Sequence, residues 1–210
     1  MPAAAPWKTL QEFVDDAKTR PGQIPYGSSG PYGTLHVAME MFAASAGIKL
    51  LHVPFRGAGP ALTALLGGTV QALASAPGVL KQQVDDGKLR VLASWGAARI
   101  SSFPNLPTFR ELGYKDVEFY IWAGLFAQAA LPAPTMTQLR KAVAEAVKAP
   151  EVVKTFETAG SPVAYLDAPE FAKFVADDSA RLIAAVTSMP RWEEPPRDWR
   201  LYTNCPFSST

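Results

Sequence analysis

Tyr26-Gly-Ser-Ser-Gly-Pro-Tyr-Gly-Thr34 is the stretch of sequence that decides how this chain folds. Its three glycines, two serines and one threonine stand between a short apolar segment and a segment with helical periodicity. Such turns leave backbone N–H groups pointing outward at the positive end of the next helix, where an anion can bind. Glycine also lets the backbone approach a ligand closely. The turn is therefore either an anion site or an ordinary connection, with Gly33 or Thr34 capping the helix.

The same order of strand, turn and helix occurs three times, and a further strand is expected at residues 88–94. Strands that alternate with helices indicate a mainly parallel sheet covered on both faces. Ligands bind to such sheets at the carboxyl ends of the strands, where the three turns are expected. The expected units are 23–26, 27–33 and 34–46; 49–55, 56–59 and 60–66; and 69–74, 75–76 and 77–86.

Other segments on either side of this pattern are also expected to be ordered. Residues 9–18 form an amphipathic helix that begins with a capping box of Thr9 and Glu12. Residues 117–128 are expected to form one long strand, and three helices are expected at 135–148, 150–159 and about 167–186. One strand cannot make a sheet, so this second part needs partner strands that the sequence does not contain.

Composition excludes several classes of function. A chain of 210 residues with a formal net charge of +1 is large enough to bury a core and gives no electrostatic case for binding nucleic acid. No apolar run is long enough to insert into a membrane, and no signal peptide is recognisable. A single cysteine, Cys205, excludes an internal disulfide, and two histidines without a cysteine cluster speak against zinc. No metal or other cofactor is expected.

Eight short motifs, in this order and spacing, carry a resemblance to a known family. Together they resemble the Bug family, the extracytoplasmic solute receptors of tripartite tricarboxylate transporters, and the resemblance covers residues 5–186. Besides the opening stretch they are Ala17-Lys-Thr-Arg-Pro-Gly22, His52-Val-Pro-Phe-Arg-Gly-Ala-Gly-Pro-Ala-Leu-Thr63, Leu65-Leu-Gly-Gly-Thr-Val70, Asp86-Gly-Lys-Leu-Arg-Val-Leu-Ala93, Phe103-Pro-Asn-Leu-Pro-Thr108, Trp122-Ala-Gly-Leu125 and Pro150-Glu-Val152.

The resemblance implies a type II periplasmic-binding fold, in which two α/β lobes close over a small carboxylate without any enzymatic step. It implies delivery of that carboxylate to membrane transporter subunits and a periplasmic location, although the missing signal peptide leaves cytoplasmic retention open. Family members carry further strands and helices ahead of the helix at 9–18, so the chain is expected to be truncated at its start. The expected domains are a complete lobe at 1–95, an incomplete second lobe at 96–190 and an irregular tail at 191–210.

The resemblance also implies a set of ligand-binding residues. Ser28, Ser29 and Gly30 match family positions whose amides and hydroxyls meet a carboxylate, while Thr34 and His36 match positions beside it. Ser75 and Ala76 match a position facing the cleft. From the sequence itself, Arg56 can pair with a carboxylate. The alternatives are a surface arginine at Arg56 and, at His36, a side chain that packs against the turn.

Enzymatic alternatives find little support in the sequence. The first turn is not a nucleophile elbow, and no lysine precedes Thr34 as a phosphate-binding Walker loop requires. The acidic pairs at 15–16, 85–86 and 177–178 are expected to face solvent on helices. Two other possibilities stay open: an α/β enzyme that handles phosphate or nucleotides, and a truncated gene product that does not bind.

Overall fold

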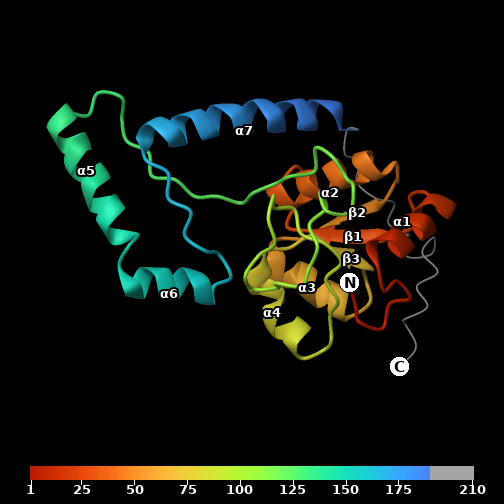
Figure 1. The fold of residues 1–210 in the computed structure, drawn as a ribbon. Helices are drawn as coiled ribbons and strands as arrows, with labels where there is room; N and C mark the ends of the chain where they lie inside the picture. The colour runs from red at the N-terminus through yellow and green to blue at the C-terminus, as the bar shows by residue number, and fades with distance from the viewer. Residues whose placement is uncertain (190–210) are drawn as a thin grey trace. The chain divides into compact units, whose positions relative to one another are not determined.

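Three parallel strands form the sheet in the computed structural model, which describes residues 1–189. The strands are β1 (Pro25–Ser28), β2 (Leu51–Pro54) and β3 (Ala72–Leu73), in the order β2-β1-β3 (Figure 1). Tyr26 of β1 lies opposite His52 of β2 and Ala72 of β3. The α/β class and the parallel sheet predicted from the sequence are confirmed.

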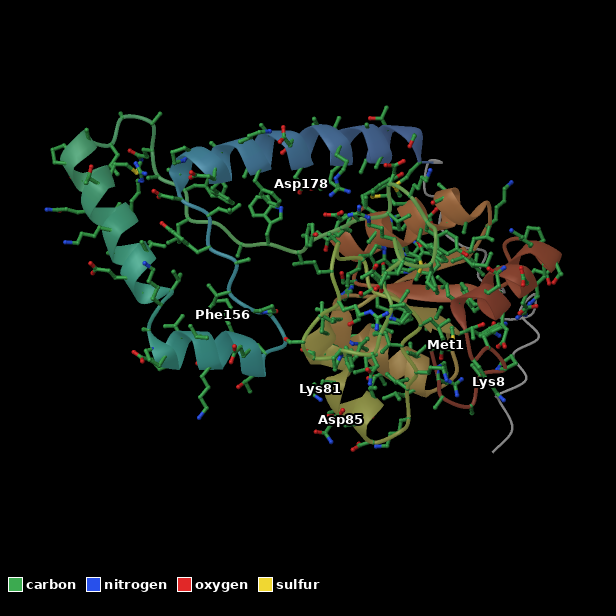
Figure 2. The ribbon with its side chains drawn as sticks, viewed as in Figure 1. Met1, Lys8, Lys81, Asp85, Phe156 and Asp178 are labelled. Atoms are coloured by element: carbon green, nitrogen blue, oxygen red, sulfur yellow. The ribbon has the colours of Figure 1, made fainter. Side chains whose placement is uncertain are left out.

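Helices cover both faces of this sheet (Figure 1). On one face, Phe13 of α1 (Leu10–Thr19) and Phe42 of α2 (Thr34–Ala46) share a buried cluster with Ile24 and Tyr26. On the other face, α3 (Ala58–Leu66) and α4 (Pro77–Asp85) pack on a second cluster that contains Val53, Leu65 and Val70. The outer side of α4 is polar, as Lys81 and Asp85 show with an exposed ion pair of 2.8 Å (Figure 2).

The segment at 88–94 is not the strand that the sequence predicts. It makes only isolated bridges, from Leu89 to Pro2 and from Ser94 to Thr108. The amide of Ala3 donates to the carbonyl of Lys88, so this segment pairs with the first residues of the chain and does not extend the sheet. The amide of Arg90 likewise donates to the carbonyl of Met1, so the backbone groups of this segment find partners outside the sheet.

The chain divides into two units, Met1–Tyr120 and Ile121–Thr187. The first unit therefore extends past residue 95, where the sequence analysis ended the lobe. Phe109 and Val117 explain the difference, because both side chains are buried in the cluster that contains α1 and α2. The expected tail at 191–210, with Cys205, lies outside the described residues.

The second unit contains three helices and no sheet: α5 (Ala133–Ala146), α6 (Pro150–Thr158) and α7 (Ala168–Ser188). The predicted strand at 117–128 is wrong, because no neighbouring strand among residues 1–189 pairs with it. Its Trp122 instead packs edge-on against Phe171 and Phe174 of α7 and donates from Nε1 to Asp178 Oδ2 at 3.0 Å. Asp178 (Figure 2) is buried, so the expectation that it faces solvent is also wrong.

No helix in residues 1–189 combines the length and the apolar character that a membrane crossing requires.

Candidate ligand-binding site

All three turns follow the carboxyl ends of neighbouring parallel strands, and so they lie at one edge of the sheet. The first two turns are joined directly, since the Phe55 amide donates to the Ser28 carbonyl at 2.9 Å. A Cβ placed on Gly30 would lie 4.0 Å from the Phe55 carbonyl oxygen. The parallel register places Gly27 opposite Leu73, and hence the third turn beside the first. The structure thus brings together the predicted residues of the three turns.

Three helices begin at this edge without a side-chain cap: α2 after Gly33, α3 after Gly57 and α4 after Ala76. None of the three has an acidic residue in its first turn. By contrast, α1 is capped by Thr9 and carries Glu12 in its first turn, as predicted. Uncapped amides and the helix dipoles make the edge locally positive without using a charged side chain.

The predicted site residues differ in how accessible they are. Ser28 is fully buried and His36 nearly so, whereas Thr34 and Arg56 are exposed. The remaining positions, Ser29, Gly30, Ser75 and Ala76, are half-buried. The Oγ atom of Ser75 is buried and has no hydrogen-bond partner among the described residues.

Gly30 is required by the backbone of the first turn. Its φ is +142°, a conformation that side chains with a Cβ rarely adopt. The Ser28 hydroxyl stabilises this turn from below, donating to the Gly30 carbonyl at 3.1 Å and accepting from the Gly30 amide at 3.2 Å.

Two stacked histidine rings lie beneath the first turn. The imidazoles of His36 from α2 and His52 from β2 have centroids 3.8 Å apart and planes within 8° of parallel. The ring of Tyr26 stacks on His52 at 5.0 Å, and its hydroxyl donates to Glu40 Oε1 at 2.6 Å. The stack is buried, with His36 3% and His52 7% exposed.

The turn is attached to this stack at two points. Ser28 Oγ lies 2.7 Å from His52 Nε2, and the amide of Tyr32 donates to His36 Nδ1 at 2.8 Å. Tyr32 itself has a φ of 54°, in the left-handed region that non-glycine residues seldom occupy. His52 and Tyr32 were not among the ligand-binding residues expected from the sequence. Strand alternation could have placed His52 on the same face as its partner Tyr26, but not against His36.

Burial controls the protonation of this group. Loss of solvation lowers the pKa of His36 to about 4, and loss of solvation together with the charge of His36 lowers the pKa of His52 to about 3. Loss of solvation also raises the pKa of Glu40, against the opposing effect of the hydrogen bond from Tyr26. Both imidazoles are therefore neutral at pH 7.

This parallel α/β lobe, with uncapped helix starts along the carboxyl edge of its sheet, has the fold of solved periplasmic binding proteins of the TctC type. Residues 1–189 match the family described as "Tripartite tricarboxylate transporter family receptor", and the chain belongs to this family. The Bug-type membership predicted from the sequence is confirmed. The family and the fold are those of substrate-binding proteins.

Known relatives and solved structures agree with this assignment. A protein of Cupriavidus necator, named "UPF0065 protein in gbd 5'region", is 34% identical over 84% of this chain and 54% of its own length. A TctC solute-binding protein from Polaromonas superposes with a TM-score of 0.78 at 30% identity, over 90% of this chain and 65% of that one. MatC from Rhodopseudomonas palustris, with bound malate, superposes with a TM-score of 0.72 at 25% identity, over 88% and 64%. The chain spans about half the length of the Cupriavidus relative.

Proposed function

We propose that this chain is the ligand-binding part of an extracytoplasmic receptor for a small carboxylate. The carboxylate binds at the edge where α2, α3 and α4 begin. The observation that carries the proposal is the convergence of three helix starts that have neither side-chain caps nor acidic residues. Such an edge favours an anion over a neutral ligand or a cation.

In the proposed complex, the carboxylate accepts hydrogen bonds from the first amides of α2 and from the Ser29 hydroxyl. The amides of Thr34 and Leu35 have no acceptor among the described residues, so they are available to it. Ser75 Oγ, at the third turn, offers a further hydroxyl, and Arg56 adds charge from the second turn. The ring of His36 is buried, so His36 acts indirectly, by accepting a hydrogen bond from the turn.

Membership of the family supports a proposal for the wider role. We infer that the receptor works in the periplasm and delivers its ligand to the membrane subunits of a tripartite tricarboxylate-type transporter. The malate in MatC supports a dicarboxylate as the first ligand to test. We place the complete lobe around the sheet and the incomplete second lobe in the unit at Ile121–Thr187.

Calorimetric titration with malate, adipate, AMP and inorganic phosphate tests the proposal. We expect malate or adipate to bind with a dissociation constant of roughly 10 µM to 1 mM, because one lobe alone buries less of a ligand than a closed pair. AMP and phosphate should bind at least tenfold more weakly. Preferential binding of AMP or phosphate would favour the enzymatic alternative, and no binding of any of the four would contradict the proposal.

A further inference from the structure

We propose that the stacked rings of His36 and His52 are the support that holds the carboxylate-binding turn in shape, which makes His52 a positioning residue for the ligand. This inference rests on the proposed function for its effect on affinity. Its structural part concerns the turn itself and can be tested without a ligand.

The turn is attached to the histidine pair at two points. Its first residue, Ser28, is held through its side chain by His52, and its fifth residue, Tyr32, is held through its amide by His36. Between them Gly30 is in a conformation with positive φ, as is Tyr32 itself. Glycine adopts such a conformation readily, but Tyr32 is strained in it and keeps it only where the surroundings hold the turn.

The two histidines that hold the turn also contact each other. His36 comes from α2 and His52 from β2, so neither element alone fixes the turn. Their rings are in face-to-face contact, and the ring of Tyr26 from β1 lies beside the pair, 5.0 Å from His52 and 6.4 Å from His36. Displacing either ring therefore moves the other and, with it, the attached end of the turn.

The hydrogen bond from Tyr32 determines which nitrogen of His36 carries the proton. The Tyr32 amide donates to Nδ1, which must therefore offer a lone pair, so the neutral ring carries its proton on Nε2. That nitrogen lies 4.0 Å from Glu40 Oε1. The groups around the two rings are Tyr26 from β1, Glu40 from α2 and Tyr32 from the turn.

The histidine support also affects ligand binding. The amides that the proposal assigns to the carboxylate begin at Thr34, two residues after the point where His36 holds the turn. Hydrogen-bond donors that are already in place do not have to be ordered when the ligand arrives. Loosening the turn should therefore weaken binding even though neither His52 nor its hydrogen bond touches the ligand.

Hydrogen–deuterium exchange of the ligand-free protein, read by NMR at single amides, tests the support. His36→Phe keeps an aromatic ring in the stack but removes the acceptor of the Tyr32 amide. We expect that amide to exchange at least tenfold faster, and His36→Gln, which restores an acceptor, to recover most of the protection. The control is Phe13→Leu, an equally buried change in α1, which should lower the melting temperature and leave this amide unchanged. Exchange of the Tyr32 amide within twofold of wild type in His36→Phe overturns the proposal.

His52 is tested with a second pair of variants. His52→Phe removes the partner of Ser28 and should speed exchange of the Gly30 amide and weaken malate binding at least tenfold, whereas His52→Gln should recover part of both. If wild type binds no carboxylate, the proposed function fails while the exchange results still decide the support. Should a variant not fold, ¹⁵N spectra of wild-type histidines suffice: His36 protonated on Nε2 supports the proposal, and His36 protonated on Nδ1 overturns it.

Discussion

The imidazole of His36 lies flat against that of His52, with ring centroids 3.8 Å apart and both rings buried under the turn that starts at Ser28. Two neutral rings can stack in this way, whereas two imidazolium ions at this distance repel each other strongly. The contact therefore links the shape of the proposed binding turn to the protonation state of the protein. The first prediction follows from this link.

We predict that the protein loses stability as the pH falls from about 6.5 towards 4. The pKa of His36 is lowered to about 4 and that of His52 to about 3, so between these values and 6.5 these two residues bind more protons in the unfolded chain than in the folded one. The free energy of unfolding is therefore highest above pH 6.5. By pH 4.5 it should have fallen by roughly 2–3 kcal/mol for each histidine.

Urea unfolding at pH 7.5, 6.0 and 4.5 measures this loss. Comparison with His36→Gln separates the histidine from the carboxylates, because glutamine keeps an acceptor for the Tyr32 amide but does not titrate. The variant should lose about half of the pH dependence in this window. An equal pH dependence in both proteins would show that His36 is protonated as easily in the folded state as in the unfolded chain.

A second prediction concerns the first turn. Ser29→Ala should weaken malate binding by about 1–3 kcal/mol, the value of a hydrogen bond to a charged group, and leave the fold intact because Ser29 is only half-buried. Gly30→Val should weaken it further, since Gly30 has a φ of +142° and a branched residue is strained there. Calorimetry measures both, with circular dichroism as the control for folding. Unchanged affinity in both variants would place the ligand elsewhere.

The repeated order of strand, turn and helix could be predicted from the sequence because its signals are local. Glycines mark the turns, Pro77 marks the first position of α4, and Thr9 marks the cap of α1. The prediction of a strand at 117–128 was wrong because strand pairing depends on a segment elsewhere in the chain. An apolar run indicates a strand only if a partner strand exists, and the sequence around Trp122 carries no information about a partner.

The candidate site was predicted only in part, for a related physical reason. The three turns could be placed at one edge because parallel strands end together there. The stack beneath them joins His36 to His52, sixteen positions further along the chain and on a different element. Burial of both rings, and with it their lowered pKa values, depends on how α2 packs on β2, which no local pattern reports.

A third prediction concerns the second unit, where neighbouring aspartates of α7 differ in burial. Asp178 is buried and accepts hydrogen bonds from Trp122 and Arg181, whereas Asp177 is exposed and pairs with Lys173. Asp178→Ala should speed exchange of the Trp122 indole N–H at least tenfold and destabilise the unit by about 1–3 kcal/mol. Asp177→Ala is the matched control and should change stability by less than about 0.5 kcal/mol. Similar effects from both changes would mean that the contact with Trp122 contributes nothing.

The last prediction separates the two kinds of positive potential at the edge of the sheet. Arg56 is exposed, so its attraction for a carboxylate is weakened by water and by salt, whereas the helix amides act through short hydrogen bonds. Arg56→Gln should therefore weaken malate binding by less than about 1 kcal/mol in dilute buffer. The difference from wild type should shrink in about 0.5 M NaCl, where the screening length is only a few ångströms.

Titrations at the two salt concentrations measure this effect. The control for net charge is Lys18→Gln, which also removes one positive charge. Lys18 lies in the last turn of α1 and not at a helix start. It should leave the affinity unchanged at both salt concentrations. If Arg56→Gln abolishes binding at both, the guanidinium holds the carboxylate directly, and the helix starts are secondary to it. A small, salt-dependent loss would instead assign most of the affinity to backbone amides, which no side-chain substitution removes.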